Sequence, residues 1–198
     1  MRRTRYPDVL FFDTVREVLG FCRRAAMIIL KMEMEMIQIL LIEGVFLCIV
    51  FWGVCWLGTG SDEKNIRNFS SYPRAVQKIV STRPELAKKI LQRSPVAVFT
   101  SNLLLFSFLL FALGIFTRQE NFAGNFLNAL LLGQALNLFD LLVIDLIWWR
   151  HTQRVRFTGT ENQPELYADP GKHISSFLRG IVMFLLVALI DGCLLSLF

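Results

Sequence analysis

Amide and acidic side chains interrupt the apolar stretch 125–149, and beyond Asn128 they are Gln134, Asn137, Asp140 and Asp145. At about 100° per residue of an α-helix, they fall within an arc of roughly 140°. Because lipid cannot satisfy amides and carboxylates, this side of the helix must face protein or a water-filled cavity. An acid without a cationic partner at such depth is typical of a proton or cation site, and equally of a hydrogen-bonded neutral carboxyl group.

Two further ionisable residues complete this polar intramembrane site. Arg179, just inside the last apolar stretch, matches Asp145 in depth, so an ion pair between them is reasonable. Such a pair could also serve only to hold two helices in register. Glu43 lies in the first apolar stretch, where a carboxylate costs roughly 2–3 kcal/mol unless it is paired or protonated. It would be interfacial instead if that helix were tilted or started later.

Two histidines offer a second kind of chemistry. His151 follows the third apolar stretch and His173 opens the fourth, so the connecting hairpin could bring both imidazoles together with loop carboxylates. Such groups bind divalent metals, but no HExxH or comparable spacing supports a metal site, and contact with lipid headgroups is the simpler interpretation. We therefore expect no cofactor. No nucleophile motif or phosphate-binding loop indicates an enzyme.

Long apolar helices must hold these residues. The chain of 198 residues is 54% hydrophobic and 19% charged, a composition that favours a membrane protein over a soluble one. Apolar runs long enough to cross a bilayer occupy about 36–57, 96–116, 125–149 and 174–197. We therefore predict an all-α, polytopic integral membrane protein with four transmembrane helices, forming a single membrane domain over residues 1–198.

An amphipathic helix is also predicted, over residues 7–35. Apolar residues recur there at alternating steps of four and three, with charged residues opposite. Such a helix lies in the membrane interface or packs on the other helices, and the sequence leaves both open. Basic residues gather in the polar segments 58–95 and 150–173, so the positive-inside rule makes that side cytoplasmic. The N-terminus is then outside, unless the first run turns back near Glu43 and Gly44.

In the polar segment 58–95, a hydroxyl residue precedes each of three prolines, directly or with one residue between. This pattern is typical of helix N-caps followed by proline in the first turn. We therefore expect N-caps at Ser71, Thr82 and Ser94, and two short surface helices over about 72–80 and 83–93.

The net positive charge of the chain favours binding to membranes rather than to nucleic acid. The formal net charge is +5, and Lys and Arg flank the apolar runs. Membrane lipids with anionic headgroups are therefore expected partners, together with a second copy of the chain or another membrane subunit. No groove-reading motif or set of RNA-stacking aromatics is present, so we expect no nucleic acid. The expected location is a cell membrane, with the bacterial inner membrane favoured.

The last third of the chain contains the block NLFDLLVIDLIWW … GTE … LY.DPGKH … FLRG. In these motifs it resembles small bacterial multi-span membrane proteins of unassigned activity. The resemblance implies a compact helical bundle. It implies no reaction, and no site residue is carried over from it.

The polar residues within the apolar runs favour a small membrane component of transport or sensing. Its polar core around Asp140 would handle a proton, a cation or a small polar solute. The alternative is a non-catalytic accessory or scaffold subunit, whose polar side is buried against a partner or a second copy. A second alternative is a membrane enzyme that acts on lipid headgroups through His151 and His173.

Overall fold

The computed structural model describes residues 34–91 and 94–197, which are helical or irregular and form no β-strand. These residues fall into two units that divide after Leu41, within the first helix. Residues 34–41 are helical and mostly exposed. Residues 7–33 of the predicted amphipathic helix lie outside the described residues, as does the N-terminus. The single domain predicted for the whole chain stays a prediction.

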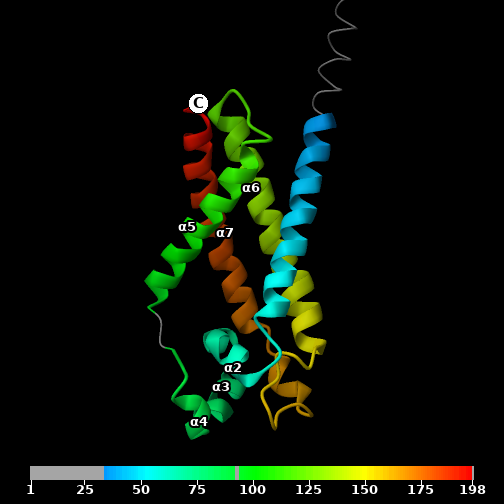
Figure 1. Cartoon of the computed structure of the whole chain (residues 1–198), viewed down its shortest axis with the longest axis vertical. Helices are drawn as coiled ribbons and strands as arrows, with labels where there is room; N and C mark the ends of the chain where they lie inside the picture. Colours follow the sequence, from blue (N-terminus) through cyan, green and yellow to red (C-terminus); the bar gives the residue numbers. More distant parts are fainter. Residues whose placement is uncertain (1–33, 92–93, 198) are drawn as a thin grey trace, which may run out of the picture. The chain divides into compact units, whose positions relative to one another are not determined.

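Within the described residues, four helices are long and apolar enough to cross a membrane, as the sequence predicts. They are the first helix, Met34–Leu57; α5, Pro95–Gly114; α6, Phe122–Phe139, which continues directly into the π-helix η2, Asp140–Trp149; and α7, Gly171–Leu195 (Figure 1). A hydrocarbon core of about 30 Å requires about 20 helical residues, and each of the four meets this length. Many of their large apolar side chains are exposed, as lipid-facing side chains would be.

The first helix runs through Glu43 and Gly44 without interruption. A return of the chain at this point, the alternative left open by the sequence, is therefore wrong. An unbroken helix satisfies every backbone group internally, whereas a turn in apolar surroundings would leave several unpaired. Gly44 faces α6, where an added Cβ would lie 3.7 Å from a methyl carbon of Leu132.

Helices α6 and α7 pack closely at two glycines (Figure 1). A Cβ on Gly180 of α7 would overlap the Asn137 amide, and one on Gly133 of α6 would overlap the Phe184 ring. Close approach at small residues is a common way for apolar helices to gain van der Waals contact. Phe184 also meets Phe106 of α5, with 5.0 Å between ring centroids, so α5 packs on the same helix.

The two polar segments fold together into a small cap, which we define as residues 58–91 and 150–170. The first segment provides α2 (Asp62–Asn65), η1 (Ile66–Ser71), α3 (Arg74–Ser81) and α4 (Pro84–Ala87), and the second provides a loop and η3 (Pro164–Tyr167) (Figure 1). The sequence predicts surface helices here, but it does not reveal that the segments share a core. This core includes Tyr72, Val76, Val80, Val155, Phe157, Tyr167 and, at the end of η2, Trp149.

Both tyrosines of the cap core are fully buried and hydrogen-bonded. The Tyr72 hydroxyl donates to the Val155 carbonyl at 2.9 Å, and the Tyr167 hydroxyl accepts from the Phe157 amide at 3.1 Å. Burial raises the pKa of Tyr72 above its ordinary value, so this phenol remains a neutral donor. The Tyr72 bond joins the first polar segment to the second, and the Tyr167 bond fixes the loop within the second segment.

The short cap helices do not start as predicted. Neither α3 nor α4 has a side-chain N-cap, and α4 is much shorter than the predicted 83–93. Ser71 ends η1, and the Thr82 hydroxyl donates back to the Ile79 carbonyl at 2.7 Å, so both predicted caps are wrong. A hydroxyl side chain can bond to a carbonyl of the preceding turn or to an amide of the following turn, and Thr82 bonds to the preceding turn. Ser94 does occupy the N-cap position of α5, but its side chain makes no capping bond.

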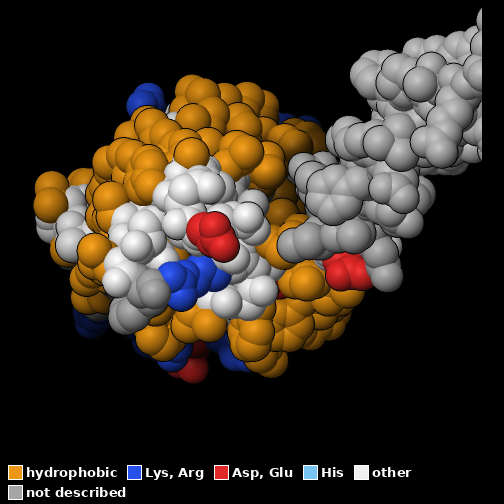
Figure 2. Space-filling model, turned by 90° about the horizontal axis from the view of Figure 1, so that it is seen from above, with side chains coloured by type: hydrophobic (Ala, Val, Ile, Leu, Met, Phe, Trp, Pro, Cys, Tyr) orange, Lys and Arg blue, Asp and Glu red, His pale blue; other side chains and the backbone are white. Residues whose placement is uncertain are grey.

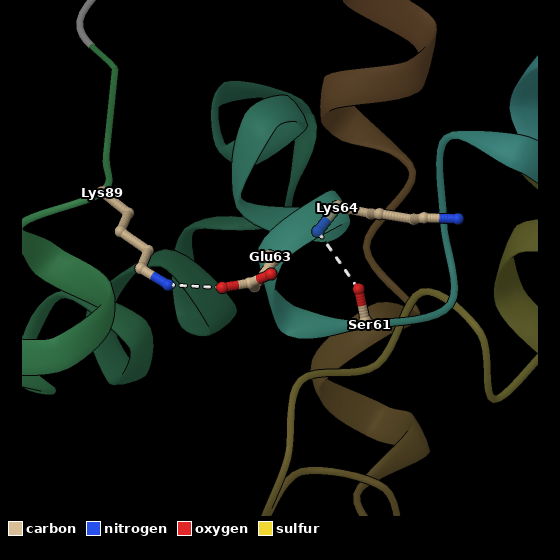
Figure 3. Close-up of polar contacts among 4 residues, drawn as sticks. All are labelled: Ser61, Glu63, Lys64 and Lys89. Atoms are coloured by element: carbon tan, nitrogen blue, oxygen red, sulfur yellow. Dashed lines mark hydrogen bonds and ion pairs between the residues drawn. The ribbon is translucent and has the colours of Figure 1, made fainter.

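The exposed edge of the cap carries two polar contacts (Figure 3). Ser61 caps α2 by accepting a hydrogen bond from the Lys64 amide at 3.4 Å. The Lys89 ammonium lies 2.7 Å from the Glu63 carboxylate, and this hydrogen bond lowers the pKa of Glu63. Both side chains of the pair are exposed, so the pair contributes little to stability.

The opposite end of the bundle is closed by asparagines. The Asn125 side chain accepts from the Gln119 amide at 2.6 Å and donates to the Gln119 carbonyl at 3.0 Å. Asn128 donates to the Thr117 carbonyl, also at 3.0 Å. Viewed from this end, hydrophobic side chains surround a small polar centre (Figure 2). The connector between α5 and α6 is thus held by side chains of α6.

Candidate functional site

Gln134 and Asn137 face α7 and bond to its backbone. Gln134 donates to the Ile181 carbonyl at 3.1 Å, and Asn137 donates to the Phe177 carbonyl at 3.2 Å. Asn137 is only 6% exposed. The neighbouring helix therefore shields these amides, and both amides form interhelical hydrogen bonds.

Asp140 and Asp145 lie in η2, so the prediction of one α-helix through residue 149 is wrong. Hydrogen bonds of a π-helix join residue i to i+5, which brings Asp140 and Asp145 to the same side. The α-helical spacing would separate them by about 140°. Asp140 is partly buried, Asp145 is its charged neighbour, and no described residue donates a hydrogen bond to Asp140. Cys55 of the first helix lies within electrostatic reach of both acids.

Asp145 pairs with His173, not with the predicted Arg179. The Nδ1 atom of His173 lies 2.9 Å from a carboxylate oxygen of Asp145, and the two side chains are 5% and 14% exposed. Helix α7 begins at Gly171, so His173 lies in its first turn beside the end of η2. Arg179, two turns further on, is exposed and forms no ion pair within the described part of the chain.

His173 joins the polar face of the bundle to the cap. Its ring meets the Trp149 ring edge-on at 4.9 Å between centroids, and Trp149 in turn contacts Tyr72 at 4.9 Å and Tyr167 at 5.6 Å. The Nε2 atom of His173 is buried and has no hydrogen-bond partner among the described residues. A buried nitrogen without a hydrogen-bond partner costs folding free energy. Such unsatisfied groups are typical of functional positions.

His151 has a different environment from His173. It is exposed, and its Nδ1 atom lies 2.6 Å from the Ile147 carbonyl of the preceding turn. Across residues 34–91 and 94–197, no group of three or more His, Cys, Asp and Glu side chains could hold a metal ion. The structure thus gives the two histidines no common metal site.

Two further acids lie elsewhere in the bundle. Glu43 is 7% exposed and approaches the Thr117 side chain, but the contact does not reach hydrogen-bond geometry. Asp191 of α7 is fully buried, and neither of its carboxyl oxygens has a partner among the described residues. Asp191 is not among the site residues predicted from the sequence.

A small hollow near the α5–α6 connector is too tight to admit a water molecule. Its lining includes Asn125 and Asn128, whose side-chain amides already donate to carbonyls of the connector. The hollow therefore does not provide a preformed site for a solute.

The ionisable centre of the described residues is thus the pair of Asp145 and His173 where η2 meets the start of α7, with Asp140 five residues before Asp145 at the beginning of η2. Of the predicted site residues, Gln134 and Asn137 lie on the same face further along α6, whereas Arg179 and Glu43 do not join the group. No protein-family model matches this chain, and comparisons with curated proteins and with solved structures give no match either.

Proposed function

We propose that the chain is an integral membrane protein whose four long helices span a cell membrane, and that it senses or transports protons. The observation that carries this proposal is the buried pair of His173 and Asp145 at 2.9 Å, within helices long and apolar enough to cross a bilayer. Ionisable groups at such positions are costly and rare, and they mark ion and proton sites in membrane proteins. The expected membrane is the bacterial inner membrane.

Three groups of this region can each hold a proton: His173, Asp145 and Asp140. Imidazole is the side chain that takes up and releases a proton most readily near neutral pH. Nδ1 of His173 is paired with the Asp145 carboxylate at 2.9 Å, so Nε2 is left as the atom that exchanges a proton. Asp140, on the same side of η2, is the next acceptor towards the middle of the helix.

The contact between His173 and Trp149 favours sensing. Protonation of His173 would add a charge next to an aromatic ring of the cap core. The resulting change in that contact would reach Tyr72 and Tyr167, which pack on the same ring. A proton taken up within the bundle would therefore alter the cap outside it.

The test compares the two histidines of the chain. Purified protein in liposomes is followed by tryptophan fluorescence and by a pH dye trapped inside the vesicles. In the His173→Gln variant, we expect the pH-dependent change of fluorescence to disappear, and with it any proton flux. The matched control is His151→Gln, which removes the exposed imidazole and should keep the response.

Each outcome has a distinct meaning for the proposal. A fluorescence response without flux supports sensing, and a response with flux supports transport. A response that persists in folded His173→Gln protein, or that both histidine variants lose equally, would contradict the proposal.

A second candidate, a non-catalytic accessory or scaffold subunit, is favoured by the bonds of Gln134 and Asn137. Because these amides are used between α6 and α7, part of the polar face has a purely structural explanation. This candidate predicts a fixed partner that co-purifies with the chain and no effect of pH on either readout.

A further inference from the structure

Arg154 lies between the cap and the end of the first helix. Its guanidinium carbon is 4.0 Å from the centre of the Trp56 ring, and its Nη2 atom donates to the carbonyls of Trp56 and Thr59, each at 3.0 Å. These carbonyls belong to the last turn of the helix and its continuation, where unpaired acceptors and the helix dipole favour a cation. The Gly60 amide also donates to the Arg154 carbonyl at 2.9 Å, so the turn closes around this residue.

All four tryptophans of the chain lie at this same end of the long helices: Trp52, Trp56, Trp148 and Trp149. The rings of Trp52 and Trp56 are 5.5 Å apart, and those of Trp56 and Trp148 are 6.2 Å apart. Trp52 and Trp56 are 40% and 39% exposed. Tryptophan concentrates at the level of lipid headgroups, so Arg154 lies at the depth of lipid phosphates.

No described carboxylate neutralises the positive charge at this level. Arg150 donates to the Ala168 carbonyl at 2.8 Å, and Arg156 donates to the carbonyls of Glu161 and Arg150. Like Arg154, both residues donate hydrogen bonds from their guanidinium groups to backbone carbonyl oxygens. Within the described ranges, none of the three forms an ion pair with a carboxylate. The Nη1 atom of Arg154 makes no hydrogen bond to a described residue and is not buried.

We propose that Arg154 and Trp56 bind the phosphate and upper acyl chain of an anionic phospholipid. The guanidinium, already held in place by two carbonyls, offers the N–H groups of its Nη1 atom to a phosphate oxygen. The exposed rings of Trp52 and Trp56 give an apolar surface for the acyl chain, and the uncompensated arginines select a headgroup with net negative charge. This inference rests on the membrane insertion proposed above.

The experiment uses the tryptophans as reporters. The full chain is reconstituted in vesicles of phosphatidylcholine and phosphatidylglycerol, in which one lipid at a time carries brominated acyl chains that quench nearby indoles. In the unmodified protein, we expect stronger quenching by brominated phosphatidylglycerol at equal mole fraction. In Arg154→Gln, this preference should fall about fivefold, the change in equilibrium that corresponds to about 1 kcal/mol per basic residue.

Lys78→Gln is the matched control, because Lys78 is an exposed residue of α3 and the substitution removes the same charge. It should keep the lipid preference. Should Arg154→Gln fail to fold, Arg154→Lys retains the charge but cannot keep both the carbonyl bonds and the ring contact, and we expect its preference to fall by at least half. Equal quenching by both lipids in the unmodified protein, or an equal loss in Lys78→Gln, would overturn the site. Absence of quenching by either brominated lipid would instead contradict membrane insertion itself.

Discussion

The helix formed by α6 and η2 has two halves that use polar residues in different ways. In α6, the amides of Gln134 and Asn137 donate to carbonyls of α7. In η2, the carboxylate of Asp145 pairs with His173, and Asp140 has no hydrogen-bond donor among the described residues.

The difference separates side chains that only hold the helices together from side chains that can exchange protons. An amide that donates to a backbone carbonyl is satisfied and cannot exchange charge, so it serves to hold α6 against α7. Carboxylates and an imidazole do exchange protons, and they coincide with the π-helical segment, a feature frequent at functional sites. Changes in the α6 half should therefore affect stability, and changes in the η2 half should affect the response to pH.

Gly180→Leu should give the largest loss of stability. A side chain at this position overlaps Asn137, so either the helices separate or the amide loses its carbonyl partner. Overpacking of this kind costs about 1–3 kcal/mol. The measurement is equilibrium unfolding in detergent, with Gly53→Leu as control, because nothing lies within 4 Å of a Cβ added at Gly53. Equal stability of the two variants would show that the close approach of α6 and α7 is not important.

Asn137→Ala should have the next largest effect. It removes the hydrogen bond to the Phe177 carbonyl, and such interhelical bonds contribute about 0.6 kcal/mol on average and at most about 1.7 kcal/mol. Unfolding is compared with that of Leu138→Ala, a change at a neighbouring exposed residue. The pH response of tryptophan fluorescence should be unchanged, and its loss would move Asn137 into the proton site.

Asp140→Asn should change stability by less than about 1 kcal/mol, because no hydrogen bond from a described residue is lost and the side chains have nearly the same shape. Its effect should appear in proton exchange, since an amide cannot accept the proton that the carboxylate accepts. The decisive readout is dye-detected flux or the pH response in liposomes. Unchanged behaviour in both would remove Asp140 from the proposed function.

Glu63→Gln in the cap should have the smallest effect. The pKa of Glu63 is lowered in the folded protein, so the contribution of its pair with Lys89 is present above the unfolded pKa and is lost as the pH falls through the folded value. Because both side chains are exposed, the change in midpoint of thermal unfolding should be close to the error of measurement. A clear loss at neutral pH would show that the cap depends on this pair.

Much of the fold follows from local patterns in the sequence. The four long helices were predictable because about 20 apolar residues in succession have few other stable arrangements. The shared core of the cap was not, because it pairs residues far apart in sequence, such as Tyr72 and Val155. The sequence does contain one sign of this core: Tyr72 and Tyr167 both lie in polar segments, where bulky aromatic residues are unexpected.

The candidate site was predictable in part. The sequence predicted that the polar face of residues 125–149 meets protein or a water-filled cavity, and the structure shows that α7 accepts its amide hydrogen bonds. The partner of Asp145 was predicted wrongly, since depth alone cannot distinguish Arg179 from His173. The π-helical turn that aligns Asp140 with Asp145 leaves no recognisable pattern in one sequence, and α-helical spacing therefore misplaced the two acids.

The most direct test of the proton site is nitrogen NMR of the imidazole in the His151→Gln variant, where His173 is the only histidine left. We predict that its Nδ1 proton remains bonded to the Asp145 carboxylate while the Nε2 signal changes with pH in step with tryptophan fluorescence. Ring signals that stay constant over the whole pH range in which the protein remains folded would contradict the account.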